Sequence, residues 1–389
     1  MRENSYCFLP KQMMQFIYYN RRELDRDTLY NIRIEKVKKG NYVEIWFMTK
    51  GCQWDAKGGC TICNYGKGIE IGKSAMIQSV LTALNEVNVE IGELAITPSG
   101  SLLDEAEVPK EVCHKIFDLV NETTAHTFLF ETRAQTVKQD TIKELISRIK
   151  NKKLIVEMGL ETSNFFLQKY CINKGYFLKE YEEAVSLLKK NNISTYANVV
   201  LGTPFLTWGQ AVHDCKNTLN WALKQNSDKV VLFPLHVKPG TMLEWLYQKG
   251  YYKPISLWGL VEVLDSIDET LLSRVEISWY KNYYTDKSKV IASPYTCDKC
   301  YGEVIRLLDE FRETSSKEVI KKLKKYPCSC KSEWEQNRKE IYSIKDRIFE
   351  IYGEMAVEFM GKDYWLKNRE TFKQELEKDY VEHLSLIHI

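Results

Sequence analysis

The chain has 389 residues, of which 44% are hydrophobic and 28% charged, and its formal net charge is +2. This composition suffices for a full core and for two domains, and the near-zero charge excludes a surface that attracts nucleic acid or anionic membrane everywhere. No run approaches the ~18 apolar residues that span a bilayer, and the first residues lack the order of a secretory signal. We expect a soluble cytoplasmic protein without membrane contacts.

Residues 1–40 are interpreted as an N-terminal extension, and a regular alternation of short apolar runs and amphipathic segments follows from residue 41. In the amphipathic segments apolar residues recur at three- and four-residue steps, which predicts helices. Strand–helix alternation at this spacing predicts an α/β fold with a parallel sheet and right-handed crossovers. Six units over 41–256 indicate a partial (β/α)6 TIM-like barrel. The predicted strands are 42–49, 93–98, 127–132, 153–160, 195–202 and 229–236.

Beyond residue 256 the alternation gives way to a C-terminal helical region, 257–383, which contains a second group of cysteines. The run of lysines at 317–325 predicts an amphipathic helix with a solvated basic face. The last six residues, "LSLIHI" (384–389), read like a translated sequencing adaptor, and we expect a non-native tail there.

Seven of the eleven cysteines fall into two groups, the first being Cys52, Cys60 and Cys63 in "KGCQWDAKGGCTICNYG". This group follows the first barrel strand, where parallel barrels place their catalytic loops. Three thiolates suit a 4Fe–4S cluster with one iron left open, and that iron can chelate S-adenosylmethionine and pass it one electron. Zinc stays open as the alternative metal at this group.

The second group offers four thiols in two close pairs, Cys297 with Cys300 and Cys328 with Cys330. Four ligands close a tetrahedron, which favours a structural zinc ion, and a second iron–sulfur cluster is the alternative. No ligand role is predicted for the remaining cysteines, which lack matched spacing: Cys7, Cys113, Cys171 and Cys215.

The first group has the spacing C-x7-C-x2-C, and further motifs follow successive predicted strands. They are "GSLLDEAEVP" (100–109), "ETR" (131–133), "GLETSN" (159–164), "INKG" (172–175), "TPFLT" (203–207) and "VKPGTMLEWLYQKGYYKP" (237–254). With "CDKC" and "CSC" near the end, this combination resembles the radical S-adenosylmethionine (radical SAM) superfamily over residues 40 to 335. Within it, the chain is similar to the archaeosine-forming enzyme and to the group that includes the radical domain of the Elongator catalytic subunit.

The strand ends supply candidate cofactor contacts. Alternation places Glu131 and Arg133 on one face, where Arg133 can grip the methionine carboxylate and Glu131 can pair with Arg133 or contact the ligand. His236 is interpreted as a structural histidine and Lys238 as a solvated lysine, with contact to substrate as the alternative for both. The resemblance implies that Ile62 and Tyr65 border the adenine and that the turn after the second strand presents groups to the methionine amine. The remaining predicted contacts are Ser99, Gly100 and Ser101 in that turn, Glu161 and Asn198 at ribose or substrate, and Gly202 at the adenine.

The resemblance implies a radical SAM enzyme that cleaves S-adenosylmethionine to a 5′-deoxyadenosyl radical. Its implied substrate is a 7-deazaguanine base in tRNA bearing a lysine adduct, whose C–N bond is cleaved to leave archaeosine. A partner enzyme that adds the lysine and an electron donor such as flavodoxin or ferredoxin are implied as well. Another nucleobase, a peptide or a small metabolite is the alternative substrate, and a non-catalytic adaptor with zinc at both cysteine groups is the alternative class. No catalytic residue is assigned.

Overall fold

The computed structural model describes residues 8–21, 28–37, 40–283 and 289–384. Cys7 and residues 385–389 of the predicted tail lie outside these ranges.

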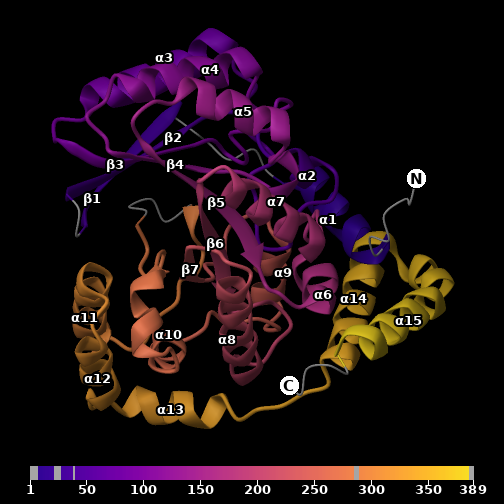
Figure 1. The fold of residues 1–389 in the computed structure, drawn as a ribbon. Helices are drawn as coiled ribbons and strands as arrows, with labels where there is room; N and C mark the ends of the chain where they lie inside the picture. The colour runs from indigo at the N-terminus through magenta and orange to yellow at the C-terminus, as the bar shows by residue number, and fades with distance from the viewer. Residues whose placement is uncertain (1–7, 22–27, 38–39, 284–288, 385–389) are drawn as a thin grey trace.

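The protein is built on one curved sheet whose eight strands are ordered as they occur in the chain (Figure 1). Six neighbouring strands are parallel and match the six predicted ones, so the partial (β/α)6 barrel is confirmed. These strands are β2 (Gly40–Phe47), β3 (Ile91–Thr97), β4 (Thr127–Glu131), β5 (Lys153–Glu161), β6 (Ser194–Leu201) and β7 (Lys229–Pro234).

Two further strands, absent from the prediction, extend the sheet at its two edges. β1 (Tyr30–Val37) pairs antiparallel with β2 and lies in the segment interpreted as an N-terminal extension. β8 (Val275–Ile277) pairs parallel with β7. The sheet is therefore a half-barrel with one antiparallel edge strand.

Helices cover the outer face of the sheet and enclose the main core (Figure 1). They form because their apolar residues share one face, as in α8, whose start is capped by the Thr207 hydroxyl and the Gln210 side chain. A small apolar cluster on the inner face joins neighbouring strands, including Ala95, Leu129 and Val231. The outer helices are α3 (Lys73–Glu86), α4 (Lys110–Asn121), α5 (Gln139–Arg148), α7 (Leu178–Lys190) and α8 (Trp208–Lys224).

The C-terminal region is helical, as predicted, and returns to the N-terminus (Figure 1). α14 packs on α1, where the Phe16 and Phe359 rings stack with centroids 4.5 Å apart, and α15 packs on α6. The remaining bounds are α1 (Phe8–Asn20), α2 (Gln53–Ala56), α6 (Phe165–Leu167), α9 (Met242–Gln248), α10 (Leu257–Asp265), α11 (Tyr301–Thr314), α12 (Lys317–Lys325), α13 (Ser329–Asn337), α14 (Ile344–Met360) and α15 (Lys362–Leu384).

The predicted basic face lies on α12, which buries Val319, Ile320 and Leu323 and exposes four of its five lysines, all but Lys317. Lys322 pairs with Glu310 of α11 at 3.0 Å and Lys324 with Asp265 of α10 at 2.7 Å. Acidic neighbours therefore reduce the positive charge of this face. Across the described ranges, no helix has both the length and the apolar character that crossing a membrane requires.

Candidate active site

A cavity of about 280 Å³ lies inside the half-barrel and is lined by residues from every strand of the sheet. Cys52, Cys60 and Cys63 all face it. Seven of the ten predicted cofactor contacts line it as well, namely Ile62, Tyr65, Gly100, Glu131, Arg133, Glu161 and Asn198. Residues from six different loops and strands therefore meet at one place, as expected where the ends of parallel strands converge.

The other three predicted contacts are not part of the lining. Ser99 and Ser101 are fully buried, and the Ser101 hydroxyl accepts hydrogen bonds from the Arg133 backbone N–H at 3.1 Å and from Nε at 3.3 Å. Gly202 has a φ of +101° and lies against Tyr252. Their cofactor roles stay predictions, and Ser101 positions Arg133 directly.

The cysteine loop is held in place by a buried ion pair from the N-terminal segment. Arg21 contacts Asp55 of this loop with both guanidinium NH2 groups, at 2.5 and 3.2 Å, and both side chains are buried. Arg21 Nε also donates to the Gly240 carbonyl at 2.7 Å. The Asp55 carboxylate accepts from the Gly66 N–H at 2.5 Å, and Gly59 (φ +49°) leaves no room for a Cβ beside it. One buried arginine therefore joins the loop to the segment after β7.

The "INKG" motif after β5 holds the same loop from the other side. Asn173 has a left-handed φ of 53°, and its amide donates to the carbonyls of Gly58 and Gly59 at 3.0 and 2.7 Å. Trp54 Nε1 donates to the Asn173 carbonyl at 2.9 Å. Thr61 bonds the same segment through the Cys171 carbonyl at 2.6 Å. This role of Asn173 was not predicted from the sequence, although asparagine is among the non-glycine residues that most often adopt a positive φ.

The "VKPG" motif after β7 supplies a third set of contacts. Asn64 donates to the Pro239 carbonyl at 2.9 Å. Lys238 donates to the Tyr65 hydroxyl at 3.0 Å, and its ammonium lies 4.4 Å from the centroid of that ring. Lys238 therefore holds Tyr65, a predicted adenine contact, at the edge of the cavity.

The positions of the three sulfurs decide which kind of metal group fits. Four thiolates on one zinc ion lie ~3.8 Å apart, because the Zn–S distance is ~2.3 Å in a tetrahedron. Among residues that the structure describes, the Cys52, Cys60 and Cys63 sulfurs do not gather within the 4.8 Å that marks a single-ion site. Their spacing is therefore wider than one tetrahedral ion requires and leaves room for a multi-iron cluster. Burial raises the pKa of all three thiols, that of Cys63 to about 12, so metal coordination would have to stabilise the thiolates.

Of the two alternatives predicted for Glu131, pairing with Arg133 is not observed, and contact with a ligand stays a prediction. Arg133 instead forms an ion pair with Asp104, which the loop after β3 brings alongside it. Glu131 accepts a hydrogen bond from the Thr97 hydroxyl at 3.4 Å. Both side chains line the cavity from separate networks.

Among the residues that the structure describes, two buried acceptors that face the cavity have no partner. Glu161 sits at φ 65°, where β5 shifts register against β6, and its Oε1 accepts from Lys174 Nζ at 2.7 Å while Oε2 has no partner. The Asn198 Oδ1 atom is buried and unpaired as well. Buried polar atoms without partners are rare, and these two fit ligand hydroxyl or N–H groups.

His236 lines the cavity but is already fully hydrogen-bonded. Its ring nitrogens contact the Ser293 hydroxyl at 3.0 Å and the Trp279 carbonyl at 2.6 Å. Burial lowers the pKa of His236 to about 4, so the ring is neutral at physiological pH. These contacts agree with the structural role favoured from the sequence.

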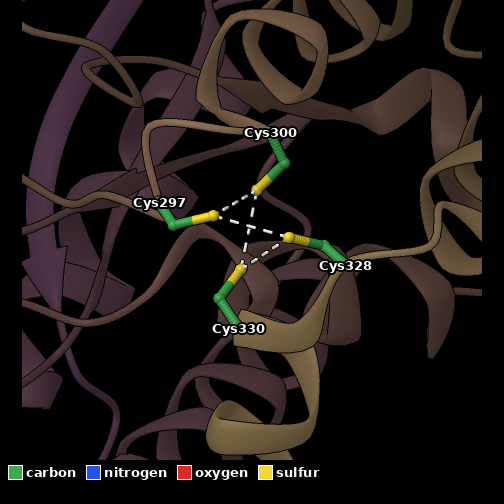
Figure 2. A group of neighbouring side chains, drawn as sticks. All are labelled: Cys297, Cys300, Cys328 and Cys330. Carbon is green, nitrogen blue, oxygen red and sulfur yellow. Dashed lines mark hydrogen bonds between the residues drawn. The ribbon is translucent and has the colours of Figure 1, made fainter.

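The second cysteine group forms a compact tetrahedron between α10, α11 and α13 (Figure 2). Sulfur–sulfur distances of 3.4 to 3.5 Å join Cys297 to Cys300 and Cys328, and Cys330 to Cys300 and Cys328. These are close to the spacing of four thiolates on one zinc ion, ~3.8 Å. Trp258 Nε1 of α10 donates to the Cys330 sulfur at 3.1 Å. A single tetrahedral ion fits this group better than a second cluster.

Comparisons with known proteins bear on the resemblance. No protein-family model matches the chain. A Methanosarcina acetivorans protein named archaeosine synthase subunit beta is 28% identical over 306 residues, covering 77% of this chain and 84% of that protein. A Thermococcus kodakarensis protein of the same name is 26% identical over 315 residues, covering 77% of this chain and 92% of that protein. The predicted resemblance is confirmed.

Among solved structures, an archaeal Methanocaldococcus infernus Elp3 with an N-terminal deletion aligns with a TM-score of 0.46 and 15% identity. The alignment covers 61% of this chain and 58% of that one. A methylornithine synthase crystal structure aligns with a TM-score of 0.44 and 14% identity, covering 60% of this chain and 63% of that one.

Proposed function

We propose that this chain is a radical SAM enzyme that acts on a modified nucleobase in tRNA. The observation that carries the proposal is the cavity: three cysteines on a loop fixed from three sides face unpaired hydrogen-bond acceptors. The alternative adaptor with zinc at both cysteine groups needs neither the wide sulfur spacing of the first group nor a cavity.

In this proposal Cys52, Cys60 and Cys63 ligate a 4Fe–4S cluster and leave one iron open. When bound, the cluster and S-adenosylmethionine supply one-electron cleavage of a C–S bond and hydrogen abstraction from the substrate. The residues of this chain bind the cofactor and the substrate and orient them. The half-barrel and the helices around it exclude water, which protects a reactive species from quenching.

Several cavity residues suit separate parts of S-adenosylmethionine. Arg133 is positioned by Asp104 and Ser101 to pair with the methionine carboxylate. The unpaired oxygens of Glu161 and Asn198 can accept from ribose hydroxyls or from substrate. The remaining contacts are proposed as the sequence predicted them: Ile62, Tyr65 and Gly202 at the adenine, Ser99, Gly100 and Ser101 near the methionine amine, and Glu131 at the ligand.

The substrate we propose is a 7-deazaguanine base in tRNA that carries a lysine adduct. The support is that two relatives, aligned over 84% and 92% of their lengths, are both named archaeosine synthase subunit beta. Cleavage of the C–N bond to the lysine side chain leaves archaeosine on the tRNA. Because those relatives are named as subunits, we propose a partner protein that adds the lysine. Flavodoxin or ferredoxin is the proposed electron donor.

We further propose that residues 41–256 form the radical SAM core and residues 257–383 a region stabilised by zinc. The zinc would bind Cys297, Cys300, Cys328 and Cys330, whose sulfur spacing supports one ion. Bound there, it would fix the start of α13 to the start of α11.

The test is anaerobic reconstitution with iron and sulfide, followed by dithionite and S-adenosylmethionine. We expect 5′-deoxyadenosine by mass spectrometry from the wild type and from Cys113→Ala, a buried cysteine of α4, and none from Cys60→Ala. With tRNA bearing the lysine adduct we expect archaeosine. Wild-type protein that binds only zinc, and makes no 5′-deoxyadenosine, would support the adaptor instead.

A further inference from the structure

Two glutamates lie side by side on the cavity floor. Glu131 of β4 and Glu157 of β5 are register partners in adjacent parallel strands, so their side chains leave the same face of the sheet. Both line the cavity. Neighbouring strands are ~4.8 Å apart, which brings the two carboxylates within direct electrostatic contact.

The basic side chains that line the cavity are each engaged elsewhere. In the described part of the chain, no ion pair joins a base to Glu131 or Glu157. Lys238 donates to Tyr65, and the ion pairs of the other four are Arg33 with Glu44, Arg133 with Asp104, Lys174 with Glu161, and Arg312 with Glu35. The glutamate pair is therefore a local excess of negative charge.

Burial raises the pKa of both glutamates, and nearby carboxylates raise it further: Glu44 acts on Glu131, and Glu131 acts on Glu157. The charges of Lys238 and Arg33 partly offset this effect at Glu131. Neighbouring carboxylates in a partly buried site are stabilised by a shared proton or by a cation between them. A bound cation would relieve this repulsion and would replace the water that the two groups have lost.

A second observation, unpaired acceptors at the same place, favours a ligand that carries hydrogen-bond donors. The Asn198 side chain of β6 donates to Glu157, and its Oδ1, buried on the cavity wall, has no partner. Glu161, only 9% exposed and four residues beyond Glu157 on β5, presents a further unpaired oxygen, Oε2. The floor thus presents unpaired acceptors beside Glu157, while the unpaired donors of the lining, such as Arg33 Nε, belong to side chains that already form ion pairs.

We propose that Glu131, Glu157 and Asn198 form a binding site for a positively charged N–H group of the substrate, a primary ammonium or an amidinium. An ammonium has three N–H donors and no acceptor, which matches three acceptors that converge from three adjacent strands. Charge-assisted hydrogen bonds of this kind are the strong ones, so the site selects a cation over a neutral or anionic group. This inference rests on the proposed function, because it names the substrate class of the same cavity.

The ammonium of S-adenosylmethionine is the competing occupant, so the cofactor must be present in the test. Three probes of equal chain length differ in charge: 1-aminopentane is positive, 1-pentanol is neutral and pentanoate is negative. Each is titrated into anaerobically reconstituted protein with saturating S-adenosylmethionine, and binding is measured by saturation-transfer NMR. From two charge-assisted hydrogen bonds we expect the amine to bind at least ~10-fold more tightly than either other probe.

Variants test whether the two glutamates cause the preference for the amine. In Glu157→Gln, and separately in Glu131→Gln, we expect the preference for the amine to fall to about twofold or less. Glu144→Gln, an equal change of charge on the outer helix α5, should keep the full preference. Two glutamine variants are used so that a folding defect in one leaves the other informative.

Equal binding of the three probes, no binding, or a preference retained in both glutamine variants would overturn the inference. A preference seen without S-adenosylmethionine and lost when it is added would overturn it too, because the cofactor would then occupy the acceptors. The same titration is repeated on metal-free protein, so that the glutamate site is tested separately from the proposed radical SAM activity. Failure to bind iron or to form 5′-deoxyadenosine counts against the proposed function, whereas the amine preference tests the glutamate site alone.

Discussion

The Arg21–Asp55 ion pair makes the sharpest prediction about how the cysteine loop is held. Both side chains are buried, at 0% and 2% exposure, and the pair joins the loop to Gly240 after β7. In Arg21→Met the Asp55 carboxylate stays buried without its cation, and the hydrogen bond to the Gly240 carbonyl is lost. Removing one partner of a buried ion pair costs about 3–5 kcal/mol, so we expect a loss of about 4 kcal/mol in the free energy of unfolding.

The assay is urea unfolding of the metal-free protein, followed by iron analysis after reconstitution. We expect Arg21→Met to bind less than half the iron of the wild type, because the loop carrying Cys52, Cys60 and Cys63 loses its anchor. The double variant Arg21→Met/Asp55→Asn, which also removes the buried charge, should recover much of the lost stability.

The matched control is Arg306→Met on α11, whose guanidinium pairs with Glu303 and Glu310 at the surface. Exposed pairs of this kind contribute little, so its unfolding should resemble that of the wild type. A loss below about 1 kcal/mol in Arg21→Met, with full iron content, would refute the anchoring role.

Three further predictions concern other parts of the molecule. Asn173→Gly keeps the left-handed backbone but loses two hydrogen bonds to the cysteine loop. The free energy of unfolding in urea should therefore fall by about 2 kcal/mol, and an unchanged value would refute the anchoring role of Asn173. Cys328→Ser should lose one zinc per chain by elemental analysis while the cavity keeps its iron; unchanged zinc would disprove the site. Burial raises the pKa of Asp214 to about 6, so the folded protein holds this proton more tightly than the unfolded chain. Stability of the metal-free protein should therefore fall by ~2 kcal/mol as the pH rises from 4 to 6.5. Asp214→Asn should lack this slope, and a slope that persists in the variant would exclude Asp214 as its cause.

Much of the fold follows from the sequence because the six central strands are buried on both faces. Runs such as residues 153–160 and 195–202 are therefore rich in apolar, often β-branched residues, which makes them visible. The two edge strands lack this signal. In β1, "YNIRIEKV", charged residues alternate with apolar ones, and β8 has only three residues. Their pairing with the sheet depends on neighbours far along the chain.

The candidate site was predictable where ligand chemistry dictates spacing and unpredictable where tertiary contacts decide. The two cysteine groups could be recognised from their spacing alone. The anchors could not, since Arg21 and Asp55 are 34 residues apart and Asn173 lies 115 residues from Gly58. The ion pair of Arg133 with Asp104 was not foreseen for the same reason: strand alternation indicates neighbours in sequence, whereas a distant loop supplies Asp104.

The central claim is that three cysteines hold a cluster whose open iron takes S-adenosylmethionine. Electron paramagnetic resonance of the dithionite-reduced protein, recorded with and without the cofactor, tests it most directly. We expect an iron–sulfur signal in the wild type and in Cys328→Ser that changes shape when S-adenosylmethionine is added. A signal indifferent to the cofactor, or one that survives replacement of Cys52, Cys60 and Cys63 together by alanine, would contradict the account.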